Sequence, residues 1–182
     1  MTIESYTTVI DFWFTEIEQS SWFKKDDNFD QLLQQRFGAV HTRASCCELY
    51  HWRQNADGRL AEIIVLDQFS RNLYRGSANA FASDPLALAL AQEAISLGLD
   101  KQLTDEKRTF LYMPFMHSES LAIHDIAMTL FKELGRESNY EYEKKHRAII
   151  EKYGRYPHRN ETLGRKSTPE EIEFLTQPGS SF

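Results

Sequence analysis

Residues 60–75 read LAEIIVLDQFSRNLYR and give the clearest indication of the fold class. Its apolar residues lie on every side of a helix drawn at 100° per residue, which predicts a buried helix from about Leu60 to Arg75, ended by Gly76. Asp67, Arg71 and Arg75 recur at intervals of four residues and therefore share one stripe. Two arginines on one stripe repel each other unless something negative lies between them, so the stripe is either a structural network or part of a site.

The remaining segments also have helical periodicity. A first helix is expected around Val9–Ile17, and a second from Phe29 to Cys47 that is broken near Gly38. Asp57-Gly58 predicts a turn. Capping residues, prolines and glycines predict further helices at 84–98, 104–114, 118–134, 138–153 and from 168 onward, with Pro114 ending or kinking its helix and Ser118 capping the next one.

Length and composition favour one folded domain. The chain has 182 residues, of which 41% are hydrophobic and 26% are charged, as in ordinary globular proteins. No alternating strand pattern competes with the helices. We therefore predict an all-α protein, a single domain over residues 1–182, with roughly seven to eight helices paired as antiparallel hairpins.

Charge and targeting signals exclude several classes of protein. The net charge of −6 argues against nucleic acid and against an anionic membrane as partners. No apolar run is long enough to span a membrane, and residues 1–5 lack the blocks of a signal peptide. Cys46 and Cys47 are neighbours in a predicted helix and have no zinc-binding spacing, so we expect them to be inert. A cytoplasmic location is expected.

The segment 144–166 is locally basic in an acidic chain. It holds eight Lys or Arg residues and only two Glu residues. Within it, GRYPHRN (154–160) is followed by Gly164-Arg165. Arginine is preferred where a carboxylate or phosphate is held by a planar fork, so this loop is a candidate binding segment rather than only a solvated face.

Two more helices carry polar residues near their apolar faces. Glu119 is expected in the first turn of the helix at 118–134, where a carboxylate is also favoured by the helix dipole. His146 falls within the apolar face of the helix at 138–153, as a core histidine or as a ligand. His124 and Asp125 lie off their helix face and are expected to be solvated.

These groups together suggest one enclosed polar pocket. If they converge, five arginines face only two carboxylates, and a buried excess of positive charge is costly without a counter-anion. The expected pocket therefore takes a small anion, with His117 or His146 as candidate catalytic acid or base. The expected ligand-binding residues are Asp67, Arg71, Arg75, Glu119, Arg155, His158, Arg159, Asn160 and Arg165.

Other chemistries lack their sequence signatures. No glycine-rich phosphate loop and no G-x-S-x-G or H-E-x-x-H motif is present. His117 and Glu119 have only weakly specific metal spacing, so no metal and no cofactor is expected. Ser118 is better explained as a helix cap than as a nucleophile.

Three long motifs resemble the bacterial domain-of-unknown-function family 924. They are LDQFSRNLYRGS (66–77), YMPFMHSE (112–119) and the run from His146 through GRYPHRN (154–160) to Leu163-Gly164-Arg165, with DFWF (11–14) as an N-terminal landmark. The resemblance covers essentially the whole chain and implies an all-helical, tetratricopeptide-like superhelical stack. It implies no activity. Ser120 stands where the family has an acidic residue, and His124-Asp125 where it has Gln-Glu.

The sequence leaves three functions open, and it does not decide whether the protein is an enzyme. The first is a pocket for a small phosphate- or carboxylate-bearing molecule, with or without acid/base chemistry. The second is an interaction module whose arginines capture an acidic peptide in a groove. The third is a buried ion network with a purely structural role.

Overall fold

The computed structural model describes residues 5–181, and throughout that range the regular structure is helical, without a strand. The prediction of an all-α fold is therefore confirmed. Residues 1–4, which were inspected for a targeting signal, lie outside the described range, as does Phe182.

The chain divides into two compact units, which are described one at a time. The first comprises the described part of Met1–Arg75 together with Asn79–Pro114, and the second Gly76–Ala78 together with the described part of Phe115–Phe182. The boundary falls directly after Pro114, inside helix α6 (Asp105–Met116). The single domain and the superhelical stack stay predictions.

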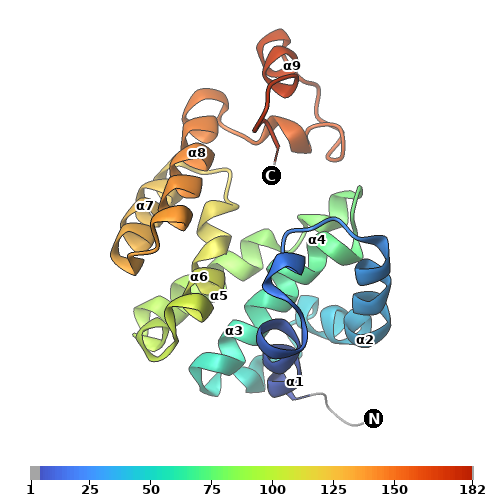
Figure 1. Ribbon diagram of the computed structural model, residues 1–182, viewed down its shortest axis with the longest axis vertical. Coiled ribbons are helices and arrows are strands. Elements are labelled where there is room, and N and C mark those ends of the chain that lie inside the picture. Colours follow the sequence, from blue (N-terminus) through green and yellow to red (C-terminus); the bar gives the residue numbers. More distant parts are fainter. Residues whose placement is uncertain (1–4, 182) are drawn as a thin grey trace. The chain divides into compact units, whose positions relative to one another are not determined.

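The first unit is built from helices α1 to α5 and most of α6 (Figure 1). Local signals begin and end them. Asp26 caps α2 by accepting hydrogen bonds from the amides of Asn28 and Phe29, and Gly98 follows α5 in the left-handed region, at φ 69°. The helices are α1 (Tyr6–Asp11), α2 (Asp27–Ser45), α3 (Ala56–Ile64), α4 (Ser70–Leu73) and α5 (Asp84–Ser96).

Aromatic side chains form the core of this unit. The rings of Phe12 and Phe37 are 4.9 Å apart, and Phe37 lies 5.1 Å from Phe69. Trp13 contacts Phe69 at 5.5 Å and Phe110 at 5.7 Å. These contacts join four segments that are distant in sequence. Aromatic residues dominate such a core because each large ring buries a large apolar surface.

The stretch 60–75 is helical but not one regular helix. Between α3 and α4 lies a π-helical turn, Val65–Phe69, and the helix ends at Leu73 rather than Arg75. Asp67 and Gln68 lie within that turn and are buried. A wide π turn adds a residue to the helix and changes the directions of the side chains that follow, so a strict 100° wheel misplaces them.

Three local predictions in the first unit are wrong. Helix α2 runs unbroken through Gly38 and ends at Ser45, which leaves Cys46 and Cys47 in a turn. Asp57-Gly58 is not a turn but the first turn of α3, capped by Asn55. Glycine is needed at position 58 because a Cβ there would lie only 2.0 Å from the Trp52 carbonyl oxygen.

The second unit contains α7 (Leu121–Leu134), α8 (Glu137–Tyr153) and α9 (Pro169–Leu175). Helices α7 and α8 pack side by side as a hairpin (Figure 1). Gly135 and Gly154 end the two helices in the left-handed region, at φ 75° and 68°. The capping box predicted at Thr168 is present at the start of α9.

The start of α7 differs from the sequence prediction. The helix begins at Leu121, with Ser120 as its cap, so Ser118 does not cap it and Glu119 precedes its first turn. The Ser118 carbonyl instead accepts a hydrogen bond from Nε2 of His124. Pro114 does not end its helix either, since α6 continues to Met116.

No helix within residues 5–181 is both long and apolar enough to cross a membrane.

Candidate functional site

The predicted site residues fall in both units. Asp67, Arg71 and Arg75 belong to the first unit. The second unit holds the other eight, His117, Glu119, His146, Arg155, His158, Arg159, Asn160 and Arg165. Each group is therefore a local arrangement with its own geometry.

In the first unit the arginine stripe meets carboxylates of the same chain. Arg71 forms two 3.1 Å hydrogen bonds to Asp84 and lies 3.2 Å from the carboxylate of Asp67. Arg75 donates to both carboxylate oxygens of Asp30, at 2.6 and 2.9 Å. The negative charge required between the two arginines is thus supplied within the unit, by Asp30 and Asp84, which the sequence analysis did not identify.

Asp30 shows how strongly this pairing acts. Burial by itself would raise the pKa of Asp30, but hydrogen bonds from Arg75 and Asn72 outweigh it and hold that pKa below its usual value. Asp30 therefore stays ionised and joins α2 to the end of α4. These contacts favour a structural role for Arg75, and its role in ligand binding stays a prediction.

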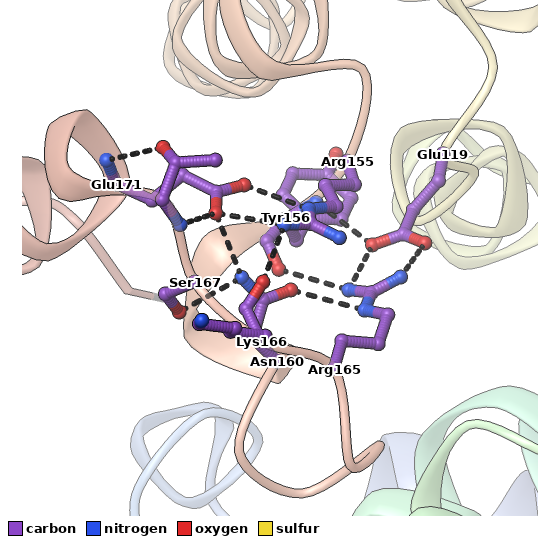
Figure 2. A network of polar contacts seen from close by, with 9 residues as sticks. Glu119, Arg155, Tyr156, Asn160, Arg165, Lys166, Ser167 and Glu171 are labelled. Carbon is purple, nitrogen blue, oxygen red and sulfur yellow. Dashed lines mark hydrogen bonds and ion pairs between the residues drawn. The ribbon is translucent and has the colours of Figure 1, made fainter.

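In the second unit, Glu119 and Arg165 form a two-pronged ion pair, shown in Figure 2. Its N···O distances are 2.6 and 2.8 Å, and Glu119 also accepts a 2.7 Å hydrogen bond from the backbone amide of Tyr156. Burial would raise the pKa of Glu119, but Arg165 and that amide outweigh it and lower the pKa. The pair ties the segment before α7 to the loop after α8.

Asn160 extends this network to α9 (Figure 2). Its Oδ1 accepts from Nε of Arg165 at 3.0 Å, and its Nδ2 donates to Glu171 at 3.2 Å. Glu171 also pairs with Arg155 at 2.7 and 2.8 Å, and the hydrogen bond from Arg155 is the main cause that lowers the pKa of Glu171 to about 2. One polar network thus anchors the loop after α8. It consists of five residues, Glu119, Arg155, Asn160, Arg165 and Glu171.

A second arrangement surrounds the buried side chain of Tyr156. The ring of His158 is centred 5.5 Å from the tyrosine ring, and that of His146 meets it edge-on at 5.8 Å. The guanidinium of Arg159 lies over the tyrosine ring, 4.6 Å from its centroid, and donates a 3.1 Å hydrogen bond to the His117 carbonyl. The side chains of His146, His158 and Arg159 and the backbone carbonyl of His117 therefore gather here, and we call these four predicted residues the histidine–arginine cluster.

His146 is held neutral within this cluster. Burial lowers its pKa to about 3, and the neighbouring histidines His117, His124 and His158 push in the same direction. Its Nδ1 donates a 2.8 Å hydrogen bond to the Tyr142 carbonyl, which leaves Nε2 as a hydrogen-bond acceptor. The prediction that His146 lies within the apolar face is confirmed by its burial.

The protein is expected to lose roughly 2 kcal/mol of unfolding free energy between pH 7 and pH 5 through His146 alone. The unfolded histidine takes up a proton near its ordinary pKa of 6.5, whereas the folded one does so only near 3. Acid therefore favours the unfolded chain, and the stability present above pH 6.5 is lost as the pH falls. Urea unfolding at several pH values measures this slope. His146→Asn should reduce it and the exposed control His51→Asn should not; an equal slope in both variants would contradict the assignment.

Beside the cluster lies a buried pair that the sequence analysis missed. Nδ1 of His124 is 2.6 Å from Oε1 of Glu143, and neither side chain is exposed. Burial raises the pKa of Glu143, although His124 opposes that rise. Nε2 of His124 also lies 3.2 Å from the Tyr156 hydroxyl. The expectation that His124 is solvated is therefore wrong, while Asp125 is exposed as expected.

Two open hollows lie on the second unit. One, of about 540 Å³, is lined by Met128, Thr129, Lys132, Glu133 and Tyr140. The other, of about 460 Å³, is lined by Lys152, Tyr153, Arg155, Thr168, Glu170 and Glu171. Only Arg155 among the predicted site residues lines either of them, and the enclosed pocket stays a prediction. Among residues 5–181, no group of three or more His, Cys, Asp or Glu side chains is placed to hold a metal ion.

Fold and site together define an all-helical protein in which a polar network anchors an arginine- and histidine-bearing loop. The chain belongs to the family of bacterial proteins of unknown function DUF924, whose sequence model matches residues 9–179.

A solved structure supports this assignment. The chain is similar to a protein of unknown function from Agrobacterium tumefaciens, with 40% sequence identity and a TM-score of 0.89. The similarity covers 93% of this chain and 96% of that one. No curated protein matches the sequence significantly.

Proposed function

We propose that the second unit binds a small oxyanion, a phosphate or a carboxylate group, at the histidine–arginine cluster. The observation that carries the proposal is the gathering of His117, His146, His158 and Arg159 around Tyr156. These side chains come from three separate stretches of sequence, and the cluster combines a guanidinium with several imidazole rings. Such groups donate hydrogen bonds to anions and repel one another when protonated, so an anion between them relieves the repulsion.

Arg159 is the central residue of this proposal. Its side chain is largely buried, and the face of Tyr156 holds its guanidinium in a fixed plane. A guanidinium in a fixed plane loses little freedom when it binds, and its fork of N–H donors matches the geometry of a carboxylate or phosphate. Arg159 is therefore suited to orient the ligand, with the rings of His117 and His158 as further donors.

The histidines suit different tasks within the proposed site. His146, with a pKa of about 3, stays neutral near pH 7 and adds no positive charge to the proposed site. A general acid or base works best with a pKa near the working pH. His146 is therefore better suited to positioning the ligand than to acid/base catalysis, and His117 remains the candidate acid or base if a reaction accompanies binding.

The polar network supports the proposed site by fixing the loop that carries it. Glu119 and Arg165 both contact Tyr156 through its backbone, and Asn160 directly follows Arg159 in the sequence. Side chains on a loop bind with precision only where their backbone is held. The network residues therefore act on ligand binding through the position of Tyr156 and Arg159 rather than through contact with the ligand.

A thermal-shift panel at fixed salt tests the proposal. It contains phosphate, sulfate, a dicarboxylate and an acidic peptide. A ligand at 100 times its dissociation constant adds about 2.7 kcal/mol of stability, which raises the melting temperature measurably. We expect a shift with at least one small anion, and about tenfold weaker binding or worse in Arg159→Gln.

Two further variants make the outcome decisive. Arg147→Gln is the matched control, because Arg147 is a partly exposed arginine of the same unit that pairs with Asp125 and Glu151. His158→Gln tests the cluster without removing the buried guanidinium. If Arg159→Gln and His158→Gln bind the anion as tightly as the control Arg147→Gln, the proposal is overturned. A shift with the acidic peptide alone would replace anion binding with peptide capture.

A further inference from the structure

The turn after α2 presents two adjacent cysteines to solvent. Cys46 and Cys47 are both exposed and both carry free thiols. The amide of Cys46 donates to the Thr42 carbonyl, and that of Cys47 to the Ala44 carbonyl at 2.9 Å. The turn is thus held by its own hydrogen bonds, and the two thiols project from a fixed backbone rather than from a loose loop.

The adjacency of the thiols disfavours a disulfide between them. Neighbouring Cα atoms across a trans peptide are about 3.8 Å apart, whereas disulfides usually join Cα atoms about 4.4–6.8 Å apart. Cys47 also has a φ of 59°, a left-handed conformation rare for residues other than glycine. The pair is therefore expected to remain a dithiol under mild oxidation.

A basic side chain lies beside this dithiol. Arg53 forms a two-pronged ion pair with the buried carboxylate of Glu62, at 2.6 and 2.7 Å, which fixes its guanidinium. The pKa of Arg53 is raised chiefly by Glu62, with a smaller contribution from Cys47, so Cys47 lies within reach of the same guanidinium. A guanidinium held in place by Glu62 therefore borders the thiol of Cys47.

We propose that Cys46 and Cys47 form a binding site for thiophilic metalloids that take two sulfur ligands, of which trivalent organoarsenicals are the representative class. The two thiols bind R–As=O with formation of two As–S bonds and loss of two S–H protons. The arsenic-bound oxygen leaves with both protons as water, and no atom is oxidised or reduced. The ring closed by arsenic is one atom larger than the ring of a disulfide, so it tolerates adjacent residues better.

The number of available sulfur ligands favours an organoarsenical over zinc as the bound species. Zinc in proteins usually takes four ligands, and in structural sites all four are side chains. Within the described chain no cluster of three or more potential metal ligands exists, so the two cysteines do not belong to a group that could hold zinc. Two thiolates are enough for a monosubstituted arsenic, whose third bond is to carbon.

The test uses the full-length, reduced protein and phenylarsine oxide, with the bound probe detected by intact-mass spectrometry. The adduct of the wild-type protein should resist displacement by a monothiol and yield to a small dithiol. Cys46→Ser and Cys47→Ser are matched controls, each with one remaining thiol and no possibility of chelation. Their adducts should be stripped at about tenfold lower monothiol concentration or less, because the second thiol acts at a high effective concentration.

Other outcomes would overturn the proposal. If the single-cysteine variants retain the probe as tightly as the wild type, the two thiols do not chelate it. If thiol titration of protein purified without reductant finds no free thiols, the pair is a disulfide and not a metalloid site. Circular dichroism of both variants establishes that they are folded, so a loss of binding reports on the thiols.

Discussion

The Glu143→Ala variant is expected to lose about 4 kcal/mol of unfolding free energy, because it removes one partner of a fully buried pair. His124 and Glu143 are both inaccessible to solvent, and the distance between Nδ1 and Oε1 is 2.6 Å. Nε2 of His124 donates to the Ser118 carbonyl, so a single proton is shared between Nδ1 and Glu143. Without Glu143, Nδ1 is left in a cavity with no hydrogen-bond partner. Urea unfolding followed by circular dichroism measures the loss.

Two companion variants distinguish the loss of the buried pair from the loss of a carboxylate as such. Glu143→Gln keeps the shape of the side chain, and its amide donates to Nδ1 of a neutral His124, so a loss of only about 1 kcal/mol is expected. Glu141→Ala removes a carboxylate from the same helix that is exposed and pairs with Lys144, and it should change stability little. A Glu143→Ala protein as stable as Glu141→Ala would contradict the account.

The second large effect is expected for Glu119→Ala, at about 3 kcal/mol. The change leaves Arg165 without its carboxylate and the backbone amide of Tyr156 without its acceptor, at a position where Tyr156 is buried. The loop from Gly154 to Thr168 then loses its ion pair with the segment before α7 and keeps the hydrogen bond from Arg159 to the His117 carbonyl. Because that loop carries His158 and Arg159, weaker anion binding should accompany the loss of stability.

Glu161→Ala is the matched control for Glu119→Ala. Glu161 is an exposed glutamate of the same loop. Its removal should change neither stability nor binding noticeably, since exposed charges contribute little. Glu119→Gln should recover part of the stability by accepting from the Tyr156 amide. Unfolding of Glu119→Ala and Glu161→Ala at the same urea concentration would contradict this role of Glu119.

Most of the helix boundaries could be predicted because their causes are local. The capping box at Thr168 and the glycines at 98, 135 and 154 each act within a turn of the chain. The start of α7 could not be placed, because the Ser118 carbonyl is engaged by a side chain six residues away. The π turn at Val65–Phe69 also carries no sequence signal that periodicity detects.

Several residues singled out from the sequence lie close together in the structure, but their contact partners could not be predicted. The like charges of Arg71 and Arg75 indicated that something negative lies near them, but left open whether the chain or a ligand supplies it. The identities of Asp84 and Asp30 depend on packing between segments 13 and 45 residues apart. His124 was misassigned because Glu143, its partner, belongs to the next helix. Long-range pairing of this kind is set by tertiary structure, which local periodicity does not encode.

The most direct test of the proposed function is a phosphate titration followed by NMR of the histidine side chains, with ring nitrogens labelled. We predict saturable changes in the resonances of His117 and His158 with one common dissociation constant, and no change for His51, which is exposed in the first unit. The changes should weaken in Arg159→Gln and persist in Arg147→Gln. Identical, non-saturating drifts of all three histidines, or no change in any of them, would contradict the proposed phosphate site.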